Sequence, residues 1–366
     1  MMGIAWRDIG LIAASLVVAF GAGLLFHTLQ VPLAWVLGPL VSTAALSVAG
    51  LSVFRSERAR RAGQLAIGAG LGLHVTASLL AEMLGWLPYM LLLALVSITV
   101  TSAFSVFLAR MGRLDRITAY FALMPGGLTE MANIGARMGA ASEPIALSQA
   151  IRVALVVCLL PPVIVALGIE GTFEPYGGEL RIVPYTELPL LFGVALIGVL
   201  VVTLARANNP WVLGALIGAA ILSSTEVIVG AMPRPVFYGG QLMLGMAIGG
   251  RFRREIILRL PRMSVVMSVF TVLVSACLFG LGMIVASLST LDPATAALAT
   301  SAGGMAEMAL TAQFLNLSVA LVVGFHVVRA ILVNGFSGTL YNLLVRIGFF
   351  ATLERLDAWL FGARRE

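Results

Sequence analysis

Two short motifs place a glutamate behind a pair of glycines, each within an apolar stretch. Gly126-Gly127-Leu128-Thr129-Glu130-Met131 returns 177 positions later (126 to 303) as Gly303-Gly304-Met305-Ala306-Glu307-Met308. A charged side chain at the centre of a membrane costs about 2.5–3.5 kcal/mol on insertion scales. The presence of this cost at two matching positions indicates that the carboxylates have a use. The chemistry that they predict is a cation or proton site shared by Glu130 and Glu307.

A structural role for the same carboxylates stays open. An arginine follows each glutamate at the same distance in sequence, Arg152 after Glu130 and Arg329 after Glu307. In this alternative each arginine pairs with its glutamate, so that neither charge is buried alone. The two hypotheses are compatible, because a paired carboxylate can still exchange a proton.

Polar side chains precede both arginines by three positions, Gln149 before Arg152 and His326 before Arg329. A spacing of three places each pair on one face of a helix. The pairs could form the polar wall of a cavity for an anionic or polar solute, or the arginines could serve as counter-ions. His326 could relay protons, since its unperturbed pKa is near 6.5, although a single helical histidine more often packs through a hydrogen bond.

The glycine pairs are also expected to interrupt helices, within residues 117–137 and 294–314. Each glycine disfavours helix by about 1 kcal/mol relative to alanine, and in the first segment Pro125 also lacks an amide donor. Broken backbone at membrane depth is tolerated only inside protein or along a water-filled cavity. A helix that restarts there points its positive N-terminus into the cavity. Paired broken helices indicate a transporter site, and Thr129 and Asn133 continue its polar side or bond between helices.

The composition requires a lipid environment for these elements. Of the 366 residues, 60% are hydrophobic and 11% are charged, whereas soluble domains carry about 25% charged residues. Lipid excludes open strand edges, so the fold class is an all-α polytopic membrane protein. The expected helical spans are 9–29, 32–50, 62–80, 86–109, 117–137 and 144–168, followed by 185–205, 210–230, 237–250, 263–287, 294–314 and 318–344.

The two sets of spans are related in sequence, because Trp35-Val36-Leu37-Gly38 also returns as Trp211-Val212-Leu213-Gly214. Arginine clusters, which favour the cytoplasmic side, occur in loops 55–61, 110–116 and 251–262. Loop 288–293, the counterpart of 110–116, contains no arginine, and neither does the segment around Glu82, the counterpart of 251–262. Because the arginine bias reverses between matching loops, we predict two inverted repeats, each with about five crossings and one broken or re-entrant helix. The alternative is six full crossings and parallel repeats.

The predicted organisation follows from these boundaries. Residues 1–168 form the first membrane repeat and residues 185–350 the second. A periplasmic linker, 169–184, joins them, and residues 351–366 form a cytoplasmic tail. The arginine-rich segment 251–262 is interpreted as a solvated face near anionic lipid.

Around the two Gly-Gly motifs the sequence resembles the Gram-negative AbrB-duplication membrane family, over most of the chain and including the duplication. Members are often labelled ammonia monooxygenase or AbrB-family transcriptional regulator, which implies a regulatory phenotype. The residues support neither label. Copper oxygenase chemistry needs several imidazole ligands, and the three histidines, at 27, 74 and 326, are scattered. No helix-turn-helix with a basic recognition helix is evident.

The leading hypothesis is a multi-pass secondary transporter of the bacterial inner membrane, coupled to protons or another ion, for an unknown small solute. The alternative is a membrane-embedded regulator or sensor that acts through a partner, and a membrane monooxygenase comes third. We expect no enzyme activity, cofactor, metal or direct nucleic-acid contact. The expected partners are lipids and a small solute or ion, and a homo-oligomer stays open. The predicted ion- and substrate-binding residues are Glu130, Glu307, Gly126, Gly127, Gly303, Gly304, Thr129, Asn133, Arg152, Arg329, His326 and Gln149.

Overall fold

The structure is a computed structural model that describes residues 6–75, 77–168, 181–205, 207, 209–252 and 254–361. Within these residues the chain is helical, apart from connecting segments and an isolated bridge between Ile182 and Ala231. Most of the predicted linker (169–180) and the end of the predicted tail (362–366) lie outside the described residues.

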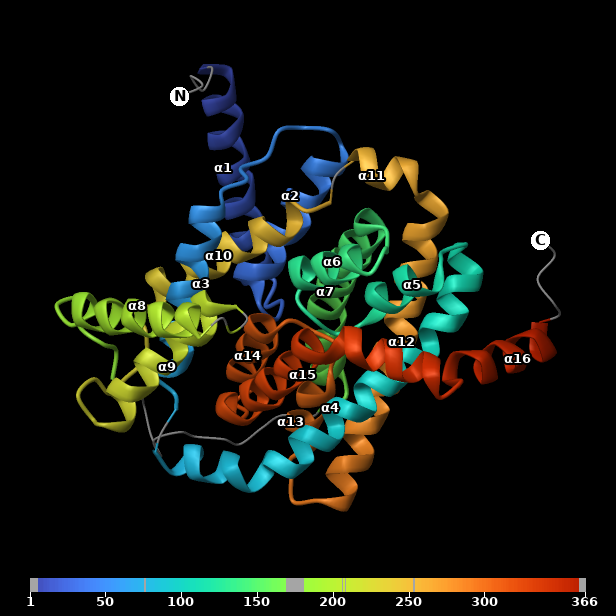
Figure 1. Ribbon diagram of the computed structural model, residues 1–366. Coiled ribbons are helices and arrows are strands. Elements are labelled where there is room, and N and C mark those ends of the chain that lie inside the picture. Colours follow the sequence, from blue (N-terminus) through green and yellow to red (C-terminus); the bar gives the residue numbers. More distant parts are fainter. Residues whose placement is uncertain are drawn as a thin grey trace.

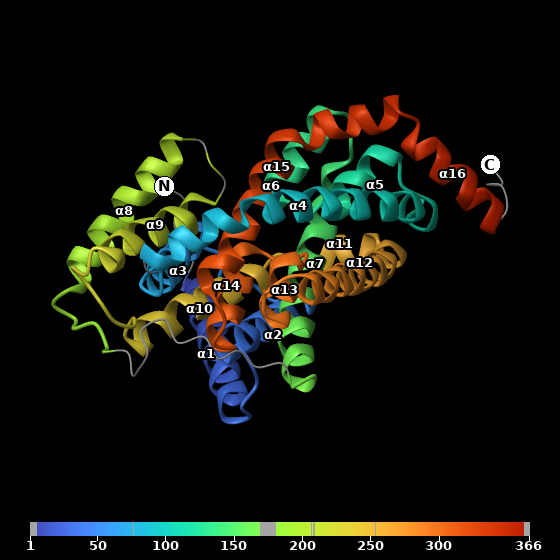
Figure 2. The same ribbon diagram turned by 90° about the horizontal axis from the view of Figure 1, so that it is seen from below.

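The helices separate into two groups (Figures 1 and 2), and each group takes helices from both halves of the sequence. The first, the α1–α3/α8–α10 group, contains α1 (Trp6–Thr28), α2 (Ala34–Val48), α3 (Glu57–Gly72), α8 (Leu188–Leu204), α9 (Pro210–Ser224) and α10 (Arg234–Gly249). The second, the α4–α7/α12–α15 group, contains α4 (Ala77–Gly112), α5 (Arg116–Leu123), α6 (Leu128–Arg137), α7 (Ser142–Ala166), α12 (Pro261–Leu288), α13 (Pro293–Thr300), α14 (Met305–Phe314) and α15 (Val319–Arg346). The short helix α11 (Arg254–Arg259) leads into α12, and α16 (Phe349–Phe361) follows α15.

Much of the outer surface is apolar, as expected of helices that face lipid. Leu204 and Leu288 are 74% and 80% exposed, which is a costly position for leucine in water. Among the described residues, four helices are long and apolar enough to cross a membrane: Glu82–Gly112, Ser142–Ala166, Pro261–Leu288 and Val319–Arg346. The chain is therefore a helical protein suited to a membrane.

Helix packing in the α1–α3/α8–α10 group depends on close backbone approach. Gly68 on α3 faces the carbonyl oxygen of Val212 on α9, and Gly245 on α10 faces the carbonyl oxygen of Val36 on α2. A Cβ at either glycine would overlap that oxygen. The glycines that the two halves share in this region therefore have a packing role, with α3 lying on α9 as α10 lies on α2.

The segments predicted to break do break. Residues 124–127 separate α5 from α6, and residues 301–304 separate α13 from α14. Each leading half-helix is capped by an aspartate, whose carboxylate accepts from an amide 2.8 Å away: Asp115 from Thr118, and Asp292 from Thr295. A carboxylate at a helix N-terminus satisfies orphan amides and complements the helix dipole.

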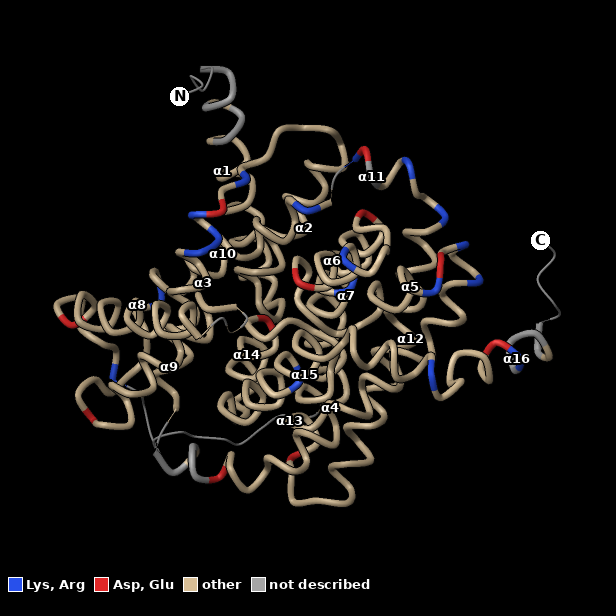
Figure 3. Tube along the Cα trace, viewed as in Figure 1, with Lys and Arg blue, Asp and Glu red and all other residues tan. Residues whose placement is uncertain are grey.

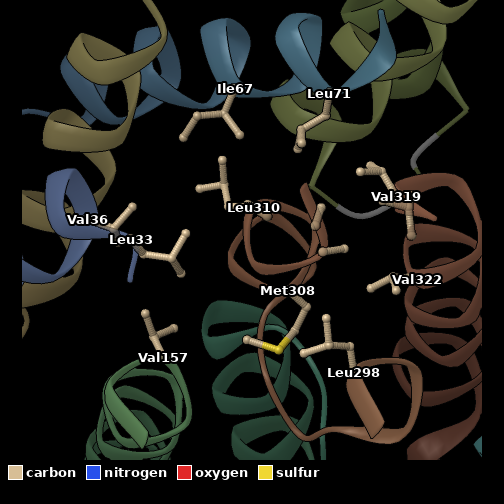
Figure 4. Packing of buried hydrophobic residues seen from close by; sticks show 14 of the residues in the cluster. Leu33, Val36, Ile67, Leu71, Val157, Leu298, Met308, Leu310, Val319 and Val322 are labelled. Carbon is tan, nitrogen blue, oxygen red and sulfur yellow. The ribbon is translucent and has the colours of Figure 1, made fainter. Parts of the chain in front are cut away.

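Apolar side chains join the two groups. Figure 4 shows Ile67 and Leu71 of α3 opposite Leu310 of α14, in a cluster that also takes side chains from α2, α7 and α15. Helix α4 begins at Ala77, before the predicted start at 86. The predicted tail is largely the helix α16, held by burial of Phe350 and an Arg116–Glu354 ion pair of 2.5 Å.

Candidate functional site

A cavity of about 620 Å³ lies between the two helix groups. Its walls come from α3, α9 and α10 on one side and from α6, α7, α14 and α15 on the other. Both broken segments reach it. The structure brings ten of the twelve predicted residues to this cavity: Gly126, Gly127, Thr129, Glu130, Arg152, Gly303, Gly304, Glu307, His326 and Arg329.

The motif shared by the two halves has a direct structural explanation. Gly127 is the N-cap of α6 and Glu130 is its third residue, and a Cβ at Gly127 would overlap Oε2 of the glutamate. Each carboxylate therefore folds back over its N-cap glycine, since Gly304 and Glu307 repeat the arrangement on α14. A glutamate at this position is the usual acidic partner of a helix N-terminus. Both glutamates thus lie at half-helix N-termini on the cavity wall.

The first glycine of each pair makes room for the methionine that ends the motif. A Cβ at Gly126 would come within 2.7 Å of the Sδ and Cε atoms of Met131, and a Cβ at Gly303 would meet Met308 at the same distance. Met131 and Met308 are fully buried. The repeated Gly-Gly-x-x-Glu-Met pattern is therefore a compact turn in which one glycine accommodates the methionine and the other accommodates the carboxylate.

The arginines donate to backbone carbonyls at the breaks and do not pair with the glutamates. Arg152 donates from Nη1 to the Met124 carbonyl oxygen at 2.6 Å and from Nη2 to the Gly126 carbonyl oxygen at 2.8 Å. Gln149 donates to the carbonyls of Phe121, Ala122 and Met124 at 2.9–3.2 Å. These carbonyls lie at and beyond the C-terminus of α5, where a helix leaves its acceptors unpaired.

The second break is held in the same way by Arg329. Its Nη1 donates to the Ser301 carbonyl oxygen, and its Nη2 donates to the Gly303 carbonyl oxygen at 3.0 Å. The pairing of Glu130 with Arg152 and of Glu307 with Arg329, expected as the structural alternative, is wrong for the described residues, because each arginine turns to carbonyls instead.

His326 lies where the first half has Gln149, yet it does not cap the break. Its Nδ1 lies 2.8 Å from the Val322 carbonyl oxygen of its own helix, so Nδ1 carries the proton and Nε2 of a neutral ring is an acceptor. The residue is 2% exposed, and Nε2 has no hydrogen-bond partner within the described part of the chain. His326 therefore presents an unused polar atom beside the cavity.

Two predicted residues do not line the cavity. Gln149 is fully buried behind the first break, where it supports the wall. Asn133 is exposed on α6 and contributes nothing to the lining. Asn133 shares a helix face with Thr129 but lies one turn further along α6, beyond the N-terminal residues that reach the cavity.

The structure adds a group of polar residues at the start of α3, which the sequence analysis did not assign to the binding site. Arg60 binds Glu57 at 2.5 Å and donates to Oε1 of Gln64 at 2.9 Å. Gln64 in turn donates to Oδ1 of Asn209 at 3.1 Å, which connects α3 to the N-cap of α9. This network raises the pKa of Arg60, mainly through the Glu57 hydrogen bond, with burial opposing it.

Two further arginines reach the cavity from different elements. The Arg61 guanidinium lies 5.6 Å from the centre of the Trp211 ring, in a cation–π arrangement. Arg251, expected on a solvated loop, lines the cavity at the end of α10. Burial lowers its pKa and the charge of Arg60 lowers it further, whereas Glu307 is the foremost charge that raises it.

The charges of the lining do not balance. Five arginines (Arg60, Arg61, Arg152, Arg251 and Arg329) face three glutamates (Glu57, Glu130 and Glu307). Figure 3 shows that most charged positions lie on loops and outer helix ends, and that a few lie inside, near α6, α7, α14 and α15. The cavity is thus a concentrated and net-positive polar site within an apolar protein.

Comparison with known proteins shows the family of this chain. Residues 35–345 match the sequence model of the family described as "Transition state regulatory protein AbrB". A Bacillus subtilis (strain 168) protein named "Uncharacterized protein YhjN" is 26% identical, over 92% of this chain and 93% of its own length. An Escherichia coli (strain K12) protein named "Putative regulator AbrB" is 25% identical, over 85% of this chain and 90% of its own length.

Proposed function

This chain belongs to the AbrB family, and we propose that it is a secondary transporter of the bacterial inner membrane, coupled to protons or another ion. The observation that carries the proposal is the cavity between the two helix groups, onto which both broken helices open. Discontinuous helices that meet at one site are the arrangement that carriers use to bind solutes within the membrane. A likeness to the architecture of carriers does not by itself establish function. The charged lining of the cavity is the stronger support for the proposal.

The two glutamates are the proposed coupling groups. Each carboxylate lies at a half-helix N-terminus that faces the cavity. The environments differ: Glu307 is 7% exposed, whereas Glu130 is only partly buried. A proton exchanged at such a site would change the field at both the helix N-terminus and the neighbouring arginines.

The proposed repeats are inverted, with about five crossings and one broken helix in each half. Matching elements have matching neighbours: α3 lies on α9 as α10 lies on α2, and α15 lies on α4 as α7 lies on α12. In this topology both termini and the arginine-rich loops are cytoplasmic. The cavity then opens to the cytoplasm, because its lining includes Glu57, Arg61 and Arg251, which belong to the arginine-rich segments 55–61 and 251–262.

Alternating access would move one helix group against the other rather than one repeat against the other. The reason is that each group contains helices from both halves, and the cavity lies at the boundary between the groups. The close glycine contacts make the α1–α3/α8–α10 group a rigid partner for this motion. Rigid-body motion around a fixed site is the common mode of secondary carriers.

Cysteine labelling tests the topology. Single cysteines at Glu82 and Glu255, placed in a background without Cys158 and Cys277, should label from opposite sides of the membrane in oriented vesicles. Labelling from the same side would support parallel repeats with six crossings.

Solute uptake tests the carrier proposal itself. Purified full-length protein in proteoliposomes, given a proton gradient, should accumulate at least one solute from a panel of small acids, amines and neutral metabolites. Protein-free liposomes provide the control. Uptake equal to that control across the whole panel would contradict the proposal.

A regulator or sensor remains the second candidate, because the Escherichia coli relative carries the name of a regulator. Such a role needs a cytoplasmic docking surface. Helix α16 is the longest candidate, yet it packs on α4 and α15 and pairs Glu354 with Arg116. Co-purification of a stoichiometric cytoplasmic partner that depends on α16 would favour this candidate.

A further inference from the structure

We infer that the cavity binds a small organic anion, whose acid group lies between Arg251, Arg60 and the N-terminus of α14. This inference rests on the proposed function and gives it a substrate class. It concerns a soluble acid with a carboxylate or a phosphate group, not a cation that the two glutamates would hold.

The first line of support is the distribution of charge around the cavity. The lining includes Arg60, Arg61 and Arg251, and the guanidinium of Arg60 already binds Glu57 and Gln64. Arg251 has no comparable carboxylate partner among the described side chains. A guanidinium near a half-helix N-terminus is a strong combination for an oxyanion, because both present N–H donors.

The second line of support is independent of the helix ends. Three buried side chains of the lining keep polar atoms without partners in the described part of the protein: Nε of Arg152, Nε of Arg329 and Nε2 of His326. They are 5%, 5% and 2% exposed. Polar atoms this buried normally have partners, so these side chains of the cavity lining have hydrogen-bonding capacity that the described protein leaves unused. Two of the three are guanidinium donors and suit an anion.

The glutamates explain how such a site persists without its ligand. Each carboxylate covers the N-cap glycine of its half-helix and so occupies the place where an incoming anion would bind the helix N-terminus. The solute acid and the glutamate therefore compete for one position. Neutralising the glutamate should strengthen anion binding, whereas a cation ligand would require the opposite.

The size of the cavity agrees with a small solute. Its volume of about 620 Å³ lies within the roughly 300–1,000 Å³ of small-molecule sites. The Trp211 ring beneath Arg61 provides an apolar wall beside the charges, suited to the carbon skeleton of the acid.

Isothermal titration calorimetry on the full chain, in phosphatidylcholine nanodiscs, provides the test. The probes are succinate, acetate and inorganic phosphate, with neutral succinamide and cationic 1,4-diaminobutane as counterparts of succinate. The variants are Arg251→Gln, which removes a cavity charge, and Glu307→Gln, which removes the competing carboxylate. Arg259→Gln is the matched control, because Arg259 is exposed on α11 and does not line the cavity.

The expected result is that at least one acid binds and the diamine does not. Arg251→Gln should weaken that binding about ten-fold or more, the effect of one lost charged contact. Glu307→Gln should strengthen it, and Arg259→Gln should leave it unchanged. Binding of the diamine, absence of binding by every acid, or equal effects of Arg251→Gln and Arg259→Gln would each overturn the inference.

The same titration in phosphatidylglycerol nanodiscs identifies the source of the acid group. Unchanged succinate or phosphate binding supports a soluble acid, whereas its loss in anionic lipid assigns the site to a lipid headgroup and overturns the inference as stated. Failure of the carrier proposal is distinguishable: acid binding without any uptake contradicts transport alone, and uptake of an amine contradicts the anion class alone.

Discussion

Replacing Arg152 or Arg329 by methionine should show that these arginines hold the broken helices together. Methionine has a similar length and no donor, so little space is left empty. Each arginine makes two hydrogen bonds to backbone carbonyls, and a hydrogen bond that involves a charge contributes about 1.5–3 kcal/mol. The loss in free energy of unfolding should therefore be about 3–6 kcal/mol.

The two substitutions should differ in size. After Arg152→Met, the Met124 carbonyl still accepts from Gln149 at 2.9 Å, so only the Gly126 carbonyl loses its side-chain donor. After Arg329→Met no such replacement exists, because His326 binds its own helix. We expect Arg329→Met to be the more destabilising, by about 1 kcal/mol, the net value of one ordinary hydrogen bond.

Denaturant unfolding in mixed micelles, followed by tryptophan fluorescence, measures both values. A double-mutant cycle with Glu130→Gln distinguishes capping from ion pairing. Capping predicts that the effects of Arg152→Met and Glu130→Gln add within about 0.5 kcal/mol. A coupling energy well above that value, or a loss no larger than that of Arg259→Met on the surface, would refute the role assigned to the arginines.

Two other substitutions test the packing of the fold. Gly68→Ala should destabilise the fold by about 1–3 kcal/mol, because its Cβ would overlap the Val212 carbonyl. Gly239→Ala, which has nothing within 4 Å of its Cβ, should be neutral or should stabilise the fold by up to about 1 kcal/mol. The same unfolding assay checks this contrast. Glu354→Gln should lower the free energy of unfolding by less than about 1 kcal/mol, because its ion pair with Arg116 is exposed. A larger decrease would indicate that α16 contributes more to the stability of the fold.

Local sequence rules were sufficient to predict the broken helices and the charged residues near them. Glycine pairs disfavour helix wherever they occur, so both interruptions could be placed from the motif. The glutamates and arginines stood out because charges are rare in apolar segments. Their partners could not be predicted, since the choice between a carboxylate and a backbone carbonyl depends on the distance between α7 and the end of α5.

The other wall of the site depends on contacts that sequence does not reveal. Arg61 and Trp211 lie 150 positions apart, in different halves, and meet because α3 packs on α9. Arg251 belongs to an arginine cluster that loop statistics place in solvent, and only the fold shows that this member reaches the cavity. A charged side chain at the start or end of a helix can face either water or a cavity. Its residue type does not distinguish the two positions.

The central claim is that Glu130 and Glu307 couple the movement of a solute to the movement of protons. Proton flux in proteoliposomes, recorded with a pH-sensitive dye in the vesicle lumen, tests it most directly when the parent is compared with Glu130→Gln and Glu307→Gln. A solute found in the uptake panel should drive proton flux in the parent, and both variants should lose this flux while they unfold at parental denaturant concentrations. Undiminished solute-driven proton flux in folded variants would contradict the claim.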